Sequence, residues 1–335
     1  MKGVLLRVLV SVFFIGLLVF TVRKEIPMVL ETLKGVRFEW VLAAIGLHGL
    51  STFLLAKRLE LIYEVQETPL PFTESVNITY VGFLFNNFLP TSVGGDLVKA
   101  YCGFRITGQK LKSFTAVLMD RLFGLFVFVL IPSVTVVFIM KGIARVIPVA
   151  IFSTLALAVC AGLLLFSKRV ARKFGFVVDV LDRFGWGERA VMLYEGLHHF
   201  RHHKKMMLEV MALSLCAQLL GIGAVYLLIR SLGGDVNPLY LLLATPVVHL
   251  MSMLPSINGL GVRETGFVYF FKGALGVHSA SALAVLYFFL LFVMSLIGGL
   301  IYLFRPDYHF RMKDVESAEK SVEAAHPVKH ERTQA

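Results

Sequence analysis

Long apolar runs alternate with short charged segments along most of this chain. The longer runs approach the roughly 20 residues that a helix needs to cross a bilayer. Their positions predict six membrane spans, at about residues 4–22, 39–56, 114–139, 146–166, 207–229 and 280–304. The pattern therefore predicts an all-α polytopic membrane protein, with one membrane domain over about 1–305 and a polar, disordered tail over 306–335.

Two further regions, at about 75–105 and 238–276, hold shorter apolar pieces that are interrupted by proline and glycine. The first break runs through Pro90 to Lys99, and the second through Pro255 to Glu264. Irregular backbone at membrane depth is tolerated only where it is buried in protein or lines a cavity. We therefore expect each region to form a pair of half-helices or a re-entrant hairpin, with one polar site where the breaks meet.

The two breaks also predict an internal repeat. Pro90 and Pro255 are separated by close to half of the chain. The second and fifth predicted spans show nearly the same separation, and so do the third and sixth. Matching interruptions in two halves are typical of transporters with inverted repeats. We predict repeats over about 1–140 and 146–305; the alternative is coincidence in an apolar chain.

The distribution of lysine and arginine predicts the orientation. The connection over about 167–206 is rich in both, which places it in the cytoplasm, together with both termini. Apolar residues at helical spacing among its charges favour an amphipathic helix on the inner leaflet. The first external loop is also basic and does not fit this topology.

Composition narrows the class of protein. Hydrophobic residues make up 57% of the chain and charged residues 16%, against about 25% charged residues in ordinary soluble domains. The net charge of +11 comes from basic residues that flank the spans and form no nucleic-acid motif, so anionic headgroups are the expected partner. No Walker A motif, metal-ligand spacing or cofactor motif is present, and we expect no cofactor and no metal.

The second break carries the strongest candidates for binding. An ionisable group near the bilayer centre costs about 2.5 kcal/mol or more, so Arg263 and Glu264 indicate a site or an ion pair. Gly259 and Gly261 would allow the backbone to turn and approach a ligand. A half-helix starting near Arg263 would aim its amide groups and its dipole at an anion.

The first break carries a similar set of charges. Asp96 and Lys99 lie one helical turn apart and face the same way, and Asn86 and Asn87 add amide groups just before the break. The alternative is structural: the charges of the two breaks could pair with one another, and the amides could join helices.

Asp120 and Arg121 lie inside an apolar span. They either brace the cavity from within or reach the cytoplasmic interface by snorkelling. The candidate substrate-binding residues are Asn86, Asn87, Asp96, Lys99, Asp120, Arg121, Asn258, Gly259, Gly261, Arg263 and Glu264.

These motifs resemble the family named after the transmembrane region of lysylphosphatidylglycerol synthase, also called flippase-like, over about 1–305. The matching segments are Asn87 to Pro90, Gly95 to Lys99, Asp120-Arg121 and Gly259 to Glu264. Many relatives have Gly-Glu and Arg where this chain has Gly95-Asp96 and Lys99. Lysine cannot form the bidentate contact that arginine makes with phosphate, which weakens the case for Lys99 as a headgroup ligand.

The resemblance implies a role in moving lipids across the bilayer. Complete synthases also carry a soluble C-terminal transferase domain, which the short tail after the last span cannot form, so we expect no enzyme activity. Our leading hypothesis is an inner-membrane lipid translocase for an anionic or glycosylated headgroup. The alternatives are a membrane partner that recruits a lipid- or glycan-synthesis enzyme through 167–206, and a headgroup transferase with Asp96 or Glu264 as general base.

Overall fold

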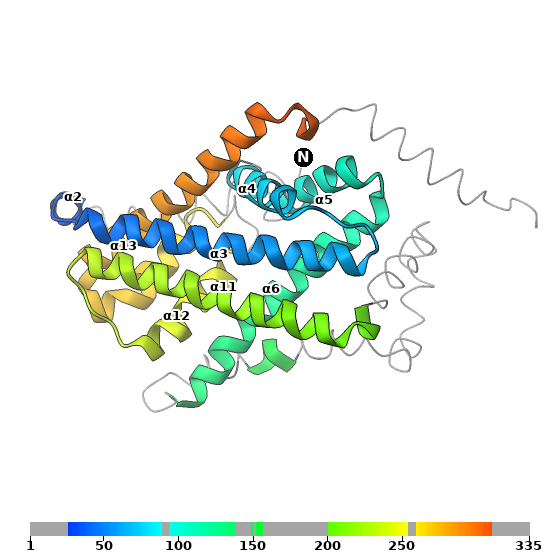
Figure 1. Ribbon diagram of the computed structural model, residues 1–335. Coiled ribbons are helices and arrows are strands. Elements are labelled where there is room, and N and C mark those ends of the chain that lie inside the picture. The colour runs from blue at the N-terminus through cyan, green and yellow to red at the C-terminus, as the bar shows by residue number, and fades with distance from the viewer. Residues whose placement is uncertain are drawn as a thin grey trace, which may run out of the picture.

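The computed structural model describes residues 26–88, 94–138, 149, 152–156, 200–253 and 259–309. Its described part is all-α, without a strand, which confirms the predicted fold class (Figure 1). The predicted span 4–22, most of 146–166, the two break segments 89–93 and 254–258, and the tail beyond 309 lie outside the described residues. So does the amphipathic connection, apart from its last residues.

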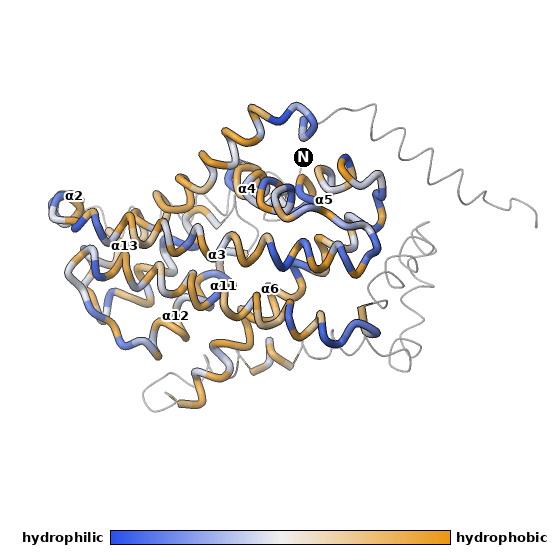
Figure 2. The backbone as a smooth tube through the Cα atoms, in the orientation of Figure 1, coloured by the Kyte–Doolittle hydropathy of each residue, from blue (hydrophilic) through white to orange (hydrophobic). Residues whose placement is uncertain are grey.

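Four of the described helices are long and apolar enough to cross a membrane. They match four of the predicted spans and are α3 (Phe38–Val65), α6 (Lys110–Phe138), α11 (Lys204–Ser231) and α13 (Val262–Phe304). Figure 2 shows hydrophobic residues along most of their length. Large apolar side chains such as Phe138 and Phe304 are more than two-thirds exposed, which suits a surface in contact with lipid.

Shorter helices occupy the two regions in which we predicted half-helices. These are α4 (Phe72–Phe88), α5 (Gly94–Thr107) and α12 (Pro238–Met251); a short α2 (Ile26–Lys34) precedes α3. The partner of α12 is the first part of α13, because Gly276 interrupts that helix with φ 79° and ψ 163°. Residues 262–275 thus form a half-helix and residues 277–304 a long helix. We call α4 with α5 the first hairpin, and α12 with 262–275 the second hairpin.

The centre of the molecule is the antiparallel pair α3 and α11, which lie side by side in Figure 1. The Ser51 hydroxyl donates to the carbonyl of Ala217 at 2.8 Å. A Cβ on Gly223 would lie 3.0 Å from Leu47, so the small residue lets the helices approach closely. The hairpins pack around this pair: α4 contacts α3 and α13, and α12 contacts α11 and α6.

The two halves share an order of backbone turns. Glu67 (φ 53°) follows α3, and Gly233 (φ 74°) follows α11. Gly108 (φ 71°) and Gly276 (φ 79°) separate the two hairpins from the long helices that follow. The left-handed conformation favours glycine at these turns. The members of each pair are separated by close to half of the chain, which is compatible with the predicted repeat. The repeat and its inverted topology stay predictions.

Candidate functional site

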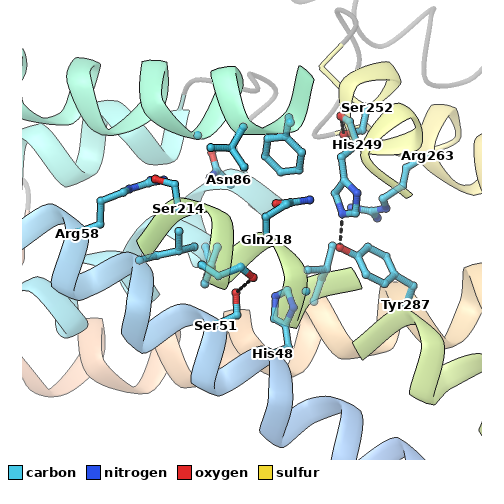
Figure 3. A pocket seen from close by; sticks show the side chains of 18 of the residues that line it. His48, Ser51, Arg58, Asn86, Ser214, Gln218, His249, Ser252, Arg263 and Tyr287 are labelled. Atoms are coloured by element: carbon cyan, nitrogen blue, oxygen red, sulfur yellow. Dashed lines mark hydrogen bonds between the residues drawn. The ribbon is translucent and has the colours of Figure 1, made fainter. Parts of the chain in front are cut away.

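A cavity of about 300 Å³ lies where α3, α4, α6, α11, α12 and α13 meet, close to both breaks (Figure 3). Its size is at the small end of the range for ligand pockets. Apolar side chains such as Phe83 and Phe128 form part of the wall. The polar residues that line it are His48, Ser51, Arg58, Asn86, Asn87, Ser214, Gln218, His249, Ser252, Arg263 and Tyr287.

Two arginines give this cavity its charge. Arg58 comes from α3 and Arg263 from the start of the half-helix 262–275, and their side chains are 6% and 5% exposed. Among the described residues that line the cavity, these two carry a permanent charge, and none is an aspartate or a glutamate. The carboxylates that pair with the arginines, Asp120 and Glu264, are not among the residues that line the cavity.

Arg263 is held by its neighbour in the sequence. Its Nη2 and Nε atoms lie 2.7 Å and 3.1 Å from Oε1 of Glu264. The other oxygen of Glu264 accepts a hydrogen bond from the backbone N–H of Gly261 at 2.7 Å. Gly261 has φ 81° directly before the helix, a conformation that favours glycine. Glu264 therefore caps the half-helix and fixes Arg263 with one side chain.

The backbone conformation and the close packing at position 259 both require glycine. Its φ is 72°, and a Cβ there would lie 2.6 Å from the Cβ of Ser252. Neither Gly259 nor Gly261 is among the residues that line the cavity, so the structure gives them a backbone role. Asn258 lies outside the described residues.

Arg58 belongs to a network of five charges that joins α3, α5 and α6. Its Nε and Nη2 atoms each lie 2.7 Å from Oδ1 of Asp120. Lys99 Nζ lies 3.5 Å from Asp120 Oδ2 and 3.9 Å from Asp96 Oδ1. Arg121 donates to Asp96. Three positive and two negative side chains leave the network with a net charge of +1.

This network shows which charges of the two hairpins pair with one another. Asp120 and Arg121 do not pair with each other: Asp120 binds Arg58 of α3, and Arg121 binds Asp96 of α5. Both therefore brace α6 against neighbouring helices. Asp96 and Lys99 pair within this network, whereas Arg263 pairs with Glu264, so the charges of the two hairpins form separate groups. None of Asp96, Lys99, Asp120 and Arg121 is among the cavity-lining residues.

The two asparagines line the cavity and also join helices. The side-chain oxygen of Asn86 accepts from the backbone N–H of Gly95 at 2.9 Å, which links α4 to α5 across the first break. The amide of Asn87 donates to Ser295 and, at 3.4 Å, to the carbonyl of Leu291 on α13. Both predicted roles, lining the site and bonding between helices, are thus compatible with their positions.

Sequence reasoning missed several residues of this cavity. Arg58 falls in a predicted loop because the predicted span ends near 56, whereas α3 continues to Val65. His48, Gln218, His249 and Tyr287 were not singled out. Each of them is a polar residue near or within an apolar run, and polar side chains in membrane helices almost always face the protein interior. That pattern could have identified them as candidates.

The polar side chains form a connected group on one side of the cavity. His249 Nε2 lies 2.5 Å from the hydroxyl of Tyr287, as the dashed line in Figure 3 shows. The guanidinium of Arg263 lies 5.8 Å from the centre of the Tyr287 ring. His48 also faces the cavity, and its Nδ1 atom is buried without a hydrogen-bond partner among the described residues.

The arrangement suits an anion that carries hydrogen-bonding groups. Guanidinium groups bind phosphate and carboxylate strongly, and the amide, hydroxyl and imidazole groups nearby can bind oxygen atoms. Within the part of the chain that the structure describes, no group of three or more histidine, cysteine, aspartate or glutamate side chains could hold a metal ion. The chemistry of the cavity is thus that of recognising a polar, negatively charged group between apolar helices.

Comparison with known proteins gives one match. The family model for the lysylphosphatidylglycerol synthase TM region matches residues 4–299. Neither the curated proteins nor the solved structures gave a match. The matched range contains both hairpins, the central helix pair and every candidate residue.

Proposed function

Because this chain belongs to the family of the lysylphosphatidylglycerol synthase transmembrane region, we propose that it is a lipid translocase that binds an anionic headgroup in its central cavity. The family places the chain among membrane proteins of lipid metabolism or transport. Binding of the headgroup and its movement across the bilayer are the proposal.

The observation that carries the proposal is the pair of buried arginines on one cavity. Arg58 and Arg263 come from different halves of the chain, and no carboxylate lines the cavity beside them among the described residues. A lipid phosphate between them would gain charge-assisted hydrogen bonds from both. The cavity of about 300 Å³ has room for a headgroup, while the acyl chains stay among the exposed apolar helix faces.

The arrangement of the helices supports a mechanism of movement. Each hairpin packs against the long helix of the other half, and the cavity lies between them. Rocking of one half against the other would expose the cavity to the two sides of the membrane in turn. We place the protein in the inner membrane with both termini in the cytoplasm, which reporter fusions to each terminus would test.

The positions of the carboxylates do not favour an enzyme. Glu264 accepts hydrogen bonds from Arg263 and from the backbone of Gly261, and Asp96 pairs with Arg121 and Lys99. A general base needs an oxygen that can take a proton from the substrate, whereas these oxygens hold positive partners. We therefore propose binding and transport without catalysis.

Mass spectrometry of co-purified lipids tests this function. The protein would be purified in mild detergent as wild type, as Arg263→Ala and as Arg230→Ala, a control in which the arginine pairs with Asp235 at a helix end. We expect one anionic lipid class to be enriched in wild type and in the control, and to be lost from Arg263→Ala. Bulk membrane lipids in all three samples would contradict the proposal.

A further inference from the structure

His249 makes two hydrogen bonds that fix its tautomer. Its Nδ1 atom lies 2.7 Å from the backbone carbonyl of Thr245. A carbonyl oxygen can only accept, so Nδ1 carries the hydrogen and donates it. In the neutral imidazole Nε2 is then an acceptor, and it takes the hydroxyl hydrogen of Tyr287 across 2.5 Å.

Protonation of His249 would reverse the bond to Tyr287. With a second hydrogen on Nε2, the imidazole would become the donor and the phenol oxygen the acceptor. The hydroxyl hydrogen of Tyr287 would then be free to turn away from His249. Tyr287 and His249 both line the cavity, so this hydrogen becomes available to a ligand there.

The charges around His249 determine when it can hold a proton. On α13, Arg263 lies over Tyr287 and is balanced by Glu264 behind it; on α3, His48 faces the same cavity, with Arg58 further along that helix. On α6, Phe128 stacks on the imidazole at 5.5 Å, and Asp120 is held by Arg58.

The remaining neighbouring groups on the cavity wall are uncharged. They are Ser51 on α3, Asn86 and Asn87 on α4, Ser214 and Gln218 on α11, and Ser252 directly after α12. Among the described residues, the permanent charges that reach the cavity interior are therefore positive. They oppose a proton on His249, and an anion in the cavity would offset them.

We propose that His249 takes up a proton from solvent when an anion enters the cavity, and that Tyr287 then donates its hydroxyl hydrogen to that anion. The inference rests on the proposed binding of an anionic headgroup and adds a coupled proton to it. One bound anion brings one proton onto Nε2 of His249. By linkage, the affinity for the anion rises as the pH falls, by at most about tenfold per pH unit.

Calorimetry measures this coupling directly. A short-chain phosphatidylglycerol would be titrated into the detergent-purified full chain between pH 6 and 8, in two buffers with different ionisation enthalpies. The difference in heat between the buffers gives the number of protons taken up per lipid bound. We expect wild type to take up a large fraction of one proton and to bind more tightly at lower pH.

Three variants assign the proton. His249→Gln should still bind the lipid, but its affinity should no longer rise as the pH falls and the uptake should be lost, because glutamine can replace both hydrogen bonds but does not titrate. Tyr287→Phe keeps the ring that contacts Arg263 and removes the hydroxyl, so its affinity at low pH should fall by about threefold to tenfold. His48→Gln removes the other imidazole of the cavity and tests whether the proton goes there instead; its affinity can change, but the uptake per lipid bound should stay as in wild type.

The outcomes separate this inference from the function on which it rests. Wild-type binding without proton uptake would overturn the coupled proton and leave the headgroup site intact. Uptake that survives in His249→Gln, or disappears in His48→Gln, would also overturn the assignment. Absence of lipid binding by wild type at every pH would overturn both the site and its coupling.

Discussion

The two hairpins beside the cavity hold their charges in different ways. In the first hairpin, Asp96 and Lys99 on α5 are bonded to Arg121 and Asp120 on α6, and Asp120 binds Arg58 on α3. In the second hairpin, the ion pair is formed by two consecutive residues and is closed by the backbone of the same hairpin. One set of charges joins three helices, and the other stays within one.

This difference determines what holds each group of charges in place. The network ties the first hairpin to α3 and α6, so its bonds depend on how those helices pack. The ion pair of the second hairpin is held by the backbone of Gly261, so it depends on that hairpin alone. A substitution in the network should therefore loosen contacts between helices, whereas one in the ion pair should act within the second hairpin.

The largest effect is expected for the centre of the network. Asp120→Ala would leave Arg58 and Lys99 without their shared partner in a buried place, which typically costs about 3–5 kcal/mol. We expect a large fall in the midpoint of thermal unfolding in detergent. The double variant Arg58→Ala with Asp120→Ala should lose less than the sum of the two single changes, because the partners act as a pair.

An exposed ion pair provides the control for that prediction. Asp235 lies 3.6 Å from Arg230 with its side chain 72% exposed. Asp235→Ala should change the free energy of unfolding by no more than about 0.5 kcal/mol. Equal losses in Asp120→Ala and Asp235→Ala would show that the buried network does not hold the three helices together.

The packing of the two hairpins gives the next prediction. A Cβ on Gly95 of the first hairpin would overlap the backbone carbonyl of Gly82, whereas one on Gly266 of the second would lie 3.2 Å from a methyl group of Val248. Gly95→Ala must push the helices apart, at a cost of about 1–3 kcal/mol. Gly266→Ala needs only a small side-chain shift.

Thermal unfolding of both glycine variants measures this difference. We expect Gly95→Ala to unfold at a clearly lower temperature than wild type and Gly266→Ala to stay close to it. The reverse order would mean that the second hairpin, and not the first, is the more tightly packed.

Within the network, the smallest effect is expected at its edge. The side chain of Arg121 is 24% exposed and bonds Asp96, which keeps Lys99 as a second partner. Arg121→Ala should therefore cost no more than about 1 kcal/mol, as partly solvated pairs do. A loss as large as that of Asp120→Ala would place the centre of the network at Asp96 instead.

The helical elements could be predicted from the sequence because the residues that interrupt a helix act on their immediate neighbours in the chain. Proline and glycine interrupt an apolar run wherever they occur, so the half-helices on either side of 89–93 and 254–258 could be expected. Arg263 and Glu264 stood out because charges are rare and costly within apolar segments. These arguments need only the neighbours of a residue in the chain.

The partners of those residues could not be predicted in the same way. Whether Arg263 binds Glu264 or Asp96 depends on how helices far apart in the sequence pack together. Arg58 was misplaced because Lys57-Arg58 resembles the end of a span, although helical structure continues to Val65. The bond from His249 to Tyr287 joins residues on different helices, and no spacing rule connects them.

Lipid translocation in reconstituted vesicles measures the proposed function itself. Vesicles with a fluorescent anionic phospholipid or a zwitterionic analogue would be treated with a membrane-impermeant quencher, for wild type, Arg263→Ala and the control Arg230→Ala. We expect wild type and the control to expose the inner pool of anionic lipid to the quencher, and Arg263→Ala to slow this at least about tenfold. Equal rates for Arg263→Ala and wild type, or a wild-type rate no faster than in protein-free vesicles, would contradict it.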